Sequence, residues 1–286
     1  MAFPIIAQKT MRKRLSYFIT FCFLLTAFSG QSQSGKLLKT VSLAPHITEL
    51  IYAVGGGDTL VAVSAYSNFP KQASEKAIIG DAFRIDLEQM IALQPDLIFY
   101  WHGTTSQQVL RQLKQHNLKT VAIKIDTLSD IGQAMLVIAT QLNLPQPAAY
   151  HQFKSRLNNL QQSTHDDSRS VFIQLSQQPL YTVSSQHWMS EAASLCGLQN
   201  IFSELPTTAA TVSQEAVIGH NPDVIIAMQA VNENNPLQQW PQITAIKQQH
   251  IAIVDPDTFS RPTPRILDAV DNLCQQVNQF SDAAGE

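Results

Sequence analysis

Short apolar runs alternate with amphipathic segments from about residue 40 onward. In the first part of the chain, the runs rich in β-branched and apolar residues are typical of strands: Thr40–Leu43, Leu60–Val63, Leu97–Trp101 and Thr120–Ile123. Between them, apolar residues at helical spacing predict helices over Thr48–Val54, from an Asp86 cap to Gln94, and around Val109–Leu113. Alternation of strands and helices predicts a parallel α/β sheet.

The middle of the chain lacks a strand pattern. From Ser129 to Leu160 the apolar positions keep a helical period, which is interrupted at Pro145 and Pro147. Alternation then resumes with strands at Val171–Leu175, Val224–Ala227 and Ile251–Val254, a helix over Met189–Leu195 and a last helix over Arg265–Phe280. The pattern predicts two α/β lobes with parallel sheets, residues 36–126 and 169–286, bridged by a long helical segment, residues 127–168.

An internal repeat supports two related lobes. Asp86–Ile98 aligns without gaps with Ser213–Ile225, and both read as a capping residue, a short helix, an X-Pro-Asp turn and a buried strand. Glu88 and Glu215 occupy the same place in the first helical turn. Two interpretations are open: each acid complements its helix dipole, or two matched lobes present two matched acids to one partner.

The N-terminus reads as a secretory signal peptide over residues 1–29. Basic residues at 12–14 precede the short apolar run Tyr17–Phe28, and small residues follow it. A single membrane anchor is the alternative, although the run is short for a bilayer span. Lipid attachment through Cys22 is a weaker alternative, and Met11 is an alternative start to Met1. We expect a soluble, exported mature chain.

Export changes how charge and cysteines are interpreted. Beyond residue 29 the chain has 15 basic and 22 acidic residues, which lacks the positive footprint of a nucleic-acid binder. Cys196 and Cys274 are the two cysteines left in an oxidising compartment, so we expect a disulfide. The alternative is two buried free thiols.

Familiar catalytic motifs are missing. The sequence has no GxSxG, HExxH, P-loop or strand-linked GxGxxG, and its histidines form no pair at a metal-binding spacing. We therefore expect no enzyme, no resident cofactor and no metal. A zinc site assembled from distant residues such as His46, His102 and His187 stays open.

Aromatic and polar residues gather where predicted strands end. The aromatic members are Tyr66, Phe83, Tyr100, Trp101, Tyr181, Trp188 and Phe259. Ligands of open α/β sheets lie beyond the carboxyl ends of strands, so these rings suit a large ligand with flat apolar faces. The alternative for each ring is that it packs in the hydrophobic core and does not contact a ligand.

Several stretches resemble the family of periplasmic cobalamin-binding proteins of bacterial vitamin importers. The resembling stretches are Ser42–Leu50, Tyr66–Pro70, Asp86–Trp101, Ala193–Phe202 and Arg261–Leu267, in order within a similarity that runs from about Thr40 to Gln279. The broader family includes haem- and siderophore-binding proteins, so the resemblance implies the fold more strongly than the ligand. It implies two α/β lobes bridged by a long helix.

The resemblance also implies roles for individual residues. Its ligand contacts fall on Tyr66, Trp101, Tyr181, Asp257, Thr258, Phe259, Ser260 and Arg261. Its two acids that dock into arginines of the membrane permease fall on Glu88 and Glu215, and its disulfide falls on Cys196 and Cys274. Two family tryptophans are replaced, by Thr258 and by Ala82 with Phe83 beside it, so the preferred corrinoid is left open.

The resulting hypothesis is a monomeric periplasmic binding protein that captures cobalamin or a related corrinoid between its lobes and delivers it to an inner-membrane ABC permease dimer. A haem or iron–siderophore binder of the same fold is the first alternative; basic residues would then be expected around the ligand, and the contact set offers only Arg261. A secreted metal-dependent enzyme is the alternative from another class.

Overall fold

The computed structural model describes residues 37–81, 83–163, 168–228 and 235–282. From Leu38 onward the chain forms one compact unit, distinct from residues 1–37. The predicted signal peptide and Ala82 lie outside the described residues. The proposed lobe boundaries at 126 and 168 remain a prediction, because the unit does not divide there.

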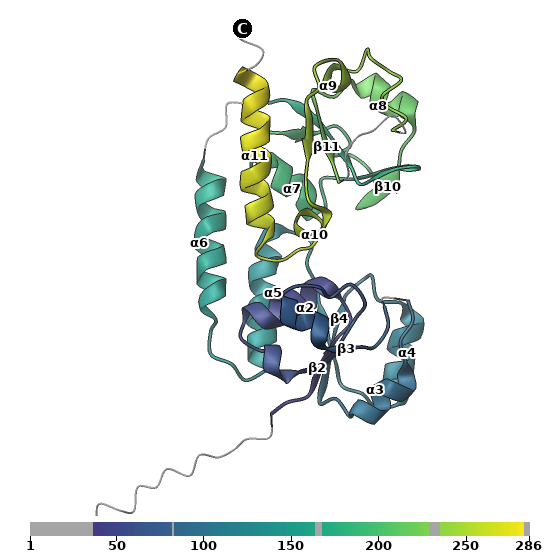
Figure 1. Cartoon of the computed structure of the whole chain (residues 1–286), viewed down its shortest axis with the longest axis vertical. Coiled ribbons are helices and arrows are strands. Elements are labelled where there is room, and N and C mark those ends of the chain that lie inside the picture. Colours follow the sequence, from purple (N-terminus) through teal and green to yellow (C-terminus); the bar gives the residue numbers. More distant parts are fainter. Residues whose placement is uncertain (1–36, 82, 164–167, 229–234, 283–286) are drawn as a thin grey trace, which may run out of the picture. The chain divides into compact units, whose positions relative to one another are not determined.

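The first sheet is parallel throughout, with strand order β3-β2-β1-β4-β5. Its strands are β1 (Thr40–Ser42), β2 (Leu60–Val63), β3 (Ala77–Ile78), β4 (Leu97–Trp101) and β5 (Thr120–Ile123). The helices between them are α2 (Pro45–Ala53), α3 (Leu87–Leu93) and α4 (Gln107–Gln115), with 3₁₀ turns at Gly57–Thr59 and Lys71–Glu75. Figure 1 shows these elements in purple to blue.

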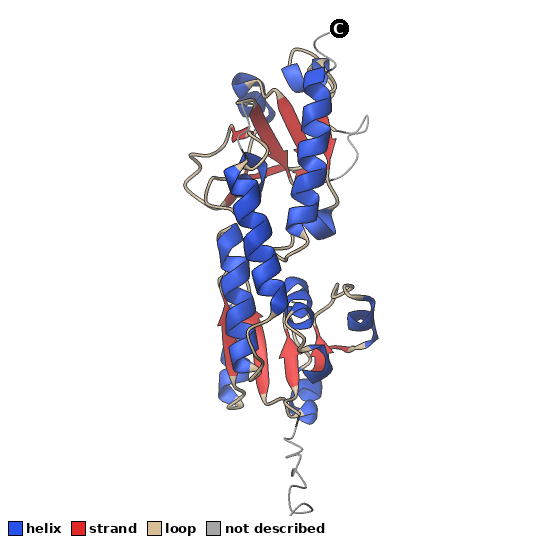
Figure 2. Ribbon diagram, turned by 90° about the vertical axis from the view of Figure 1, so that its left-hand side faces the viewer, coloured by secondary structure: helices blue, strands red, loops and turns tan. Residues whose placement is uncertain are grey.

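The second sheet is also parallel, with order β12-β11-β6-β9. It contains β6 (Ser170–Gln174), β9 (Gln199–Asn200), β11 (Val224–Ala227) and β12 (Ile251–Ile253). Its helices are α7 (Trp188–Ser194), α8 (Gln214–His220), α9 (Thr244–Lys247), α10 (Pro256–Phe259) and α11 (Ile266–Asp282). Figure 2 shows helices flanking the strands of both sheets. The predicted α/β fold with two parallel sheets is confirmed.

A small antiparallel sheet accompanies the second parallel sheet, and the sequence pattern did not predict it. It has the order β10-β8-β7, with β7 (Ser176–Gln177), β8 (Leu180–Val183) and β10 (Ala209–Thr211). Two of these strands have only two or three residues, which is too short for an alternating pattern to stand out.

Two helices, rather than one continuous helix, make up the bridging segment. A reciprocal capping box between Thr127 and Asp130 starts α5 (Leu128–Gln141). The chain then turns and continues as α6 (Ala148–Gln162), which packs beside α5 (Figure 1). Pro145 and Pro147 lie in the turn; proline has no amide hydrogen to donate and its ring clashes inside a helix, so the predicted helical run divides there.

One hydrophobic core is shared by both parallel sheets. It contains Phe99 from β4, Met135 from α5, Ile173 from β6 and Leu273 from α11, all fully buried. Smaller clusters lie on the outer faces, one under α3 and α4 and one under α8 and α9. The shared core fixes the elements that carry the candidate site.

The disulfide between Cys196 and Cys274 is present, with an S–S distance of 2.00 Å. It joins the end of α7 to α11. The predicted pairing is confirmed, and the alternative of two free thiols is wrong.

Candidate functional site

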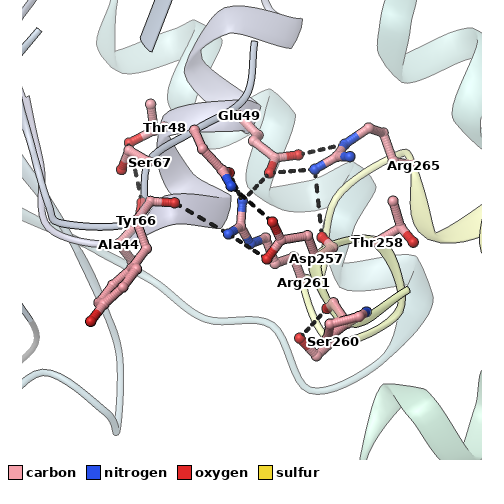
Figure 3. A network of polar contacts seen from close by, with 12 residues as sticks. Ala44, Thr48, Glu49, Tyr66, Ser67, Asp257, Thr258, Ser260, Arg261 and Arg265 are labelled. Carbon is pink, nitrogen blue, oxygen red and sulfur yellow. Dashed lines mark hydrogen bonds and ion pairs between the residues drawn. The ribbon is translucent and has the colours of Figure 1, made fainter. Parts of the chain in front are cut away.

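The loop after β2, residues 64–70, presents a tyrosine ring to solvent. The Tyr66 residue is 80% exposed, and its φ of 66° lies in the left-handed region, which costs energy for a side chain other than glycine. The hydroxyls of Ser67 and Thr48 share a hydrogen bond of 3.1 Å, and the Asn68 amide donates to the Tyr66 carbonyl at 2.9 Å. Figure 3 shows the ring directed away from the polar groups behind it. The loop therefore displays an aromatic face on a held backbone.

The run of predicted ligand contacts Asp257–Arg261 covers the last three residues of α10 and the two residues that follow it. Asp255 caps this short helix by accepting from the Thr258 amide at 2.9 Å. The hydroxyls of Thr258 and Ser260 donate to backbone oxygens of the same turn. These hydroxyls thus stabilise the turn that carries the segment's charged residues.

A buried carboxylate joins this segment to the Tyr66 loop. Glu49, on α2, accepts from Nε and Nη2 of Arg265 at 2.9 and 2.7 Å, and from Nη1 of Arg261 at 3.0 Å (Figure 3). Arg261 Nη2 also donates to Asp257 at 2.7 Å, and its Nη1 donates to the Asn68 side-chain oxygen at 2.6 Å. The Asn68 amide in turn donates to Asp257 at 2.8 Å. We call these five residues the Glu49 network.

The charges of the Glu49 network balance. Two carboxylates, Glu49 and Asp257, face the guanidinium groups of Arg261 and Arg265. Each arginine donates charge-assisted hydrogen bonds to an acid of the chain itself. The network therefore offers an incoming ligand no surplus positive charge.

Aromatic side chains of α2, β4 and α7 meet near this network. The His46 ring packs edge-on against Trp101 with centroids 4.4 Å apart, and the Trp101 and Trp188 centroids are 6.0 Å apart. Burial, reinforced by the charge of Arg261, lowers the pKa of His46 to about 3, so its imidazole is neutral. Trp101 is half-buried, and Trp188 is buried.

The two remaining predicted aromatic contacts differ in exposure. Tyr181, on β8, is 36% exposed, so its ring has surface to offer. Phe259 is 0% exposed and lies in the core shared by both sheets. The core alternative therefore describes Phe259 in this structure, and its role as a ligand contact stays a prediction.

The repeated acids occupy equivalent positions. Glu88 is the second residue of α3, which Asp86 caps, and Glu215 is the second residue of α8, which Ser213 caps. Both acids are exposed, and within the described residues neither is in a salt bridge. Hydrogen bonds from its own backbone amide and from Ser213 lower the pKa of Glu215. Each acid therefore presents an exposed side chain on the first turn of its helix.

The sequence matches the family model described as periplasmic binding protein over residues 40–258. The chain belongs to the periplasmic binding protein family.

Its similarity to individual members of the family is substantial. It is 35% identical over 249 residues to a protein named vitamin B12-binding protein of Pectobacterium carotovorum subsp. carotovorum, which covers 85% of this chain and 89% of that one. The solved periplasmic vitamin B12 binding protein BtuF of Vibrio cholerae superposes with a TM-score of 0.77 at 33% identity, over 85% of this chain and 97% of that one. The periplasmic heme binding protein HutB of Vibrio cholerae reaches 0.72 at 20% identity, over 84% and 98%. The last similarity shows the fold alone.

The zinc alternative can be compared with the described residues, whereas the membrane-anchor alternative concerns Tyr17–Phe28, which lie outside them. Within the described part of the chain, no three His, Cys, Asp or Glu side chains come together to hold a metal ion, so His46, His102 and His187 do not form the open zinc alternative. None of the described helices combines the length and apolar composition needed to cross a bilayer.

Sequence reasoning missed Glu49, Asn68 and Arg265 as site residues. The helix pattern suggested a start at Thr48, whereas α2 begins at Pro45, so Glu49 lies in its second turn on a buried side. Proline in the first helical turn was the available signal. No sequence signal pairs Glu49 with arginines more than 200 residues away.

Proposed function

We propose that this chain is a periplasmic carrier that binds cobalamin and delivers it to an inner-membrane ABC permease. The observation that carries the proposal is the identity of 33–35%, over most of both chains, with proteins whose names state vitamin B12 binding. The haem-binding neighbours share the fold at TM-scores of 0.71–0.72, below the 0.77 of the vitamin B12 binding protein, and at only 20% identity or less.

The proposed ligand contacts come from the loop after β2, from β4, from β8 of the small antiparallel sheet, and from α10 with the two residues after it. They are Tyr66, Trp101, Tyr181, Asp257, Thr258, Ser260 and Arg261; Phe259 acts from the core. Exposed or half-exposed rings suit the flat apolar faces of a corrin, and the polar groups of Asp257–Arg261 suit its amide periphery.

Charge favours a corrinoid over haem. A haem brings two propionate carboxylates, and burying them next to the Glu49 network would require cations that are already bonded to Glu49 and Asp257. The uncharged amides of a corrin need no such partner. The balanced network therefore supports the cobalamin proposal over the haem alternative.

Delivery is assigned to Glu88 and Glu215. A symmetric permease dimer with one arginine pocket per subunit would receive one acid from each repeat, so the internal repeat of the carrier would match the symmetry of its partner. The mature protein is proposed to act as a monomer in the periplasm after removal of residues 1–29.

The test is calorimetric titration of the purified, disulfide-bonded protein with cobalamin, cobinamide and haemin. We expect saturable binding of one cobalamin per chain, at least about tenfold tighter than haemin, a difference of about 1.4 kcal/mol. Tighter binding of haemin than of cobalamin would transfer the assignment to the haem alternative.

A further inference from the structure

Glu49 belongs to no predicted contact set, and its side chain is only 3% exposed. It nevertheless holds both arginines that reach the Tyr66 loop (Figure 3). We propose that Glu49 is a positioning residue, which fixes the Tyr66 loop and α10 relative to each other before a ligand arrives. The inference deepens the proposed function and rests on it only for the identity of the ligand.

The two arginines grip the loop at three positions. Arg261 Nη2 donates to the Tyr66 carbonyl at 3.2 Å, and its Nη1 donates to the Asn68 side chain at 2.6 Å. The Arg265 guanidinium lies 3.9 Å from the centre of the Phe69 ring, a cation–π contact. Three parts of one short loop thus contact the two arginines that Glu49 binds: the Tyr66 carbonyl, the Asn68 side chain and the Phe69 ring.

Glu49 can serve as the fixed point because α2 cannot shift easily. Its neighbours Ile47, Leu50 and Ile51 are fully buried in the core shared by both sheets. A long arginine side chain has many rotamers, and two hydrogen bonds from one guanidinium to one carboxylate select a single one. The rigid partner is therefore the glutamate.

The Glu49 carboxylate also holds α10 and the connection from Arg261 to Arg265. Arg261 directly follows the turn that ends α10, and Arg265 directly precedes α11. Because both ends of this connection bond to Glu49, α10 is tied to α2 at the same point as the Tyr66 loop. Buried ion pairs typically add little net stability compared with apolar side chains of the same volume, but they demand one geometry. The buried ion pairs of Glu49 are therefore better suited to fixing the geometry of the site than to stabilising the fold.

The experiment compares Glu49→Gln with the unaltered protein, first without ligand. Glutamine keeps the shape and removes the charge that orients both guanidinium groups. We expect amide hydrogen exchange to rise about tenfold in residues 64–70 and 256–265, while strands β4 and β11 keep their protection. Calorimetry should then show cobalamin affinity about tenfold weaker, because the variant must order the site on binding.

Arg156→Gln is the matched control. Arg156 bonds to Asp268 and Asp271 and so ties α6 to α11 with a cluster of ion pairs that is exposed rather than buried. Among the described residues, no hydrogen bond or ion pair joins this cluster to Tyr66 or Asp257. It should change neither the exchange of the two segments nor the affinity. If Glu49→Gln does not fold, Arg265→Lys keeps every charge and removes the two-pronged bond, and we expect the same two effects in weaker form.

Unchanged exchange in both segments would overturn the inference. So would an equal rise in β4 and β11, since Glu49 would then support the whole fold. A protein that does not bind cobalamin would contradict the proposed function, while the exchange of the ligand-free protein would still decide the role of Glu49.

Discussion

Tyr66 combines an exposed ring with a backbone conformation that an ordinary residue avoids. The Thr48 hydroxyl of α2 bonds to the loop on one side, and Arg261 bonds to it on the other. A ring kept in this way loses little freedom on binding, so more of its contact energy remains as affinity.

Truncating Tyr66 to Ala should therefore weaken cobalamin binding by about 1–3 kcal/mol, the range for a large apolar contact in a binding site. Trp101→Ala should fall in the same range. Val137→Ala is the control, because Val137 is a 43% exposed apolar side chain on α5 and belongs to no candidate set. Calorimetric affinities check all three; wild-type binding by both site variants would place the ligand elsewhere.

The sequence indicated candidate rings, but it did not indicate the charged pairs of the Glu49 network. Aromatic residues after strands identified Tyr66 and Trp101, since strand ends are where α/β sheets present side chains. The same rule included Phe259, because the rule does not say which way a ring turns. Glu49 and Arg265 escaped notice because their pairing depends on folding across more than 200 residues.

At the scale of elements, the two copies of the internal repeat also make equivalent hydrogen bonds. Gln94 and Asn221 end α3 and α8 in the left-handed conformation, and each is followed by Pro-Asp. The Asp96 carboxylate accepts from the Lys39 amide at 2.8 Å, and that of Asp223 accepts from the Ser170 amide at 2.9 Å. In both sheets, an aspartate before one strand binds the start of its parallel neighbour.

Asp223→Ala should leave the Ser170 amide and hydroxyl without their acceptor. We expect the free energy of unfolding to fall by about 1–3 kcal/mol, as measured by chemical denaturation. Asp126→Ala is the control: Asp126 makes an exposed pair with Lys124, and such pairs contribute about 0–1 kcal/mol. Equal losses in the two variants would show that the turn aspartate is not a special stabilising residue.

Element type was largely predictable, and element boundaries were less so. The β-branched runs at β2, β4, β5 and β11 gave the strands, because buried parallel strands read as continuous apolar segments. The pattern started α2 three residues late, since Pro45 was treated as loop rather than as the first helical residue.

At the scale of the whole molecule, we propose that capture and delivery use different surfaces. The proposed ligand contacts cluster around the Glu49 network, whereas Glu88 and Glu215 lie on the first turns of α3 and α8 and belong to no part of it. The repeat in the sequence predicted their equivalence, and the structure gives them matching caps. Their pairing with a permease is a proposal that transport measurements can test.

The most direct measurement is cobalamin uptake into vesicles that contain the permease dimer of the same organism. The unaltered carrier should support uptake. Glu88→Ala combined with Glu215→Ala should bind cobalamin within about twofold of wild type and yet support no uptake, because losing one partner of a desolvated charge pair costs several kcal/mol. Glu75→Ala with Glu204→Ala removes one exposed glutamate from each half of the chain and should transport normally. Failure of the unaltered carrier to deliver cobalamin, or normal transport by the Glu88 and Glu215 double variant, would contradict the account.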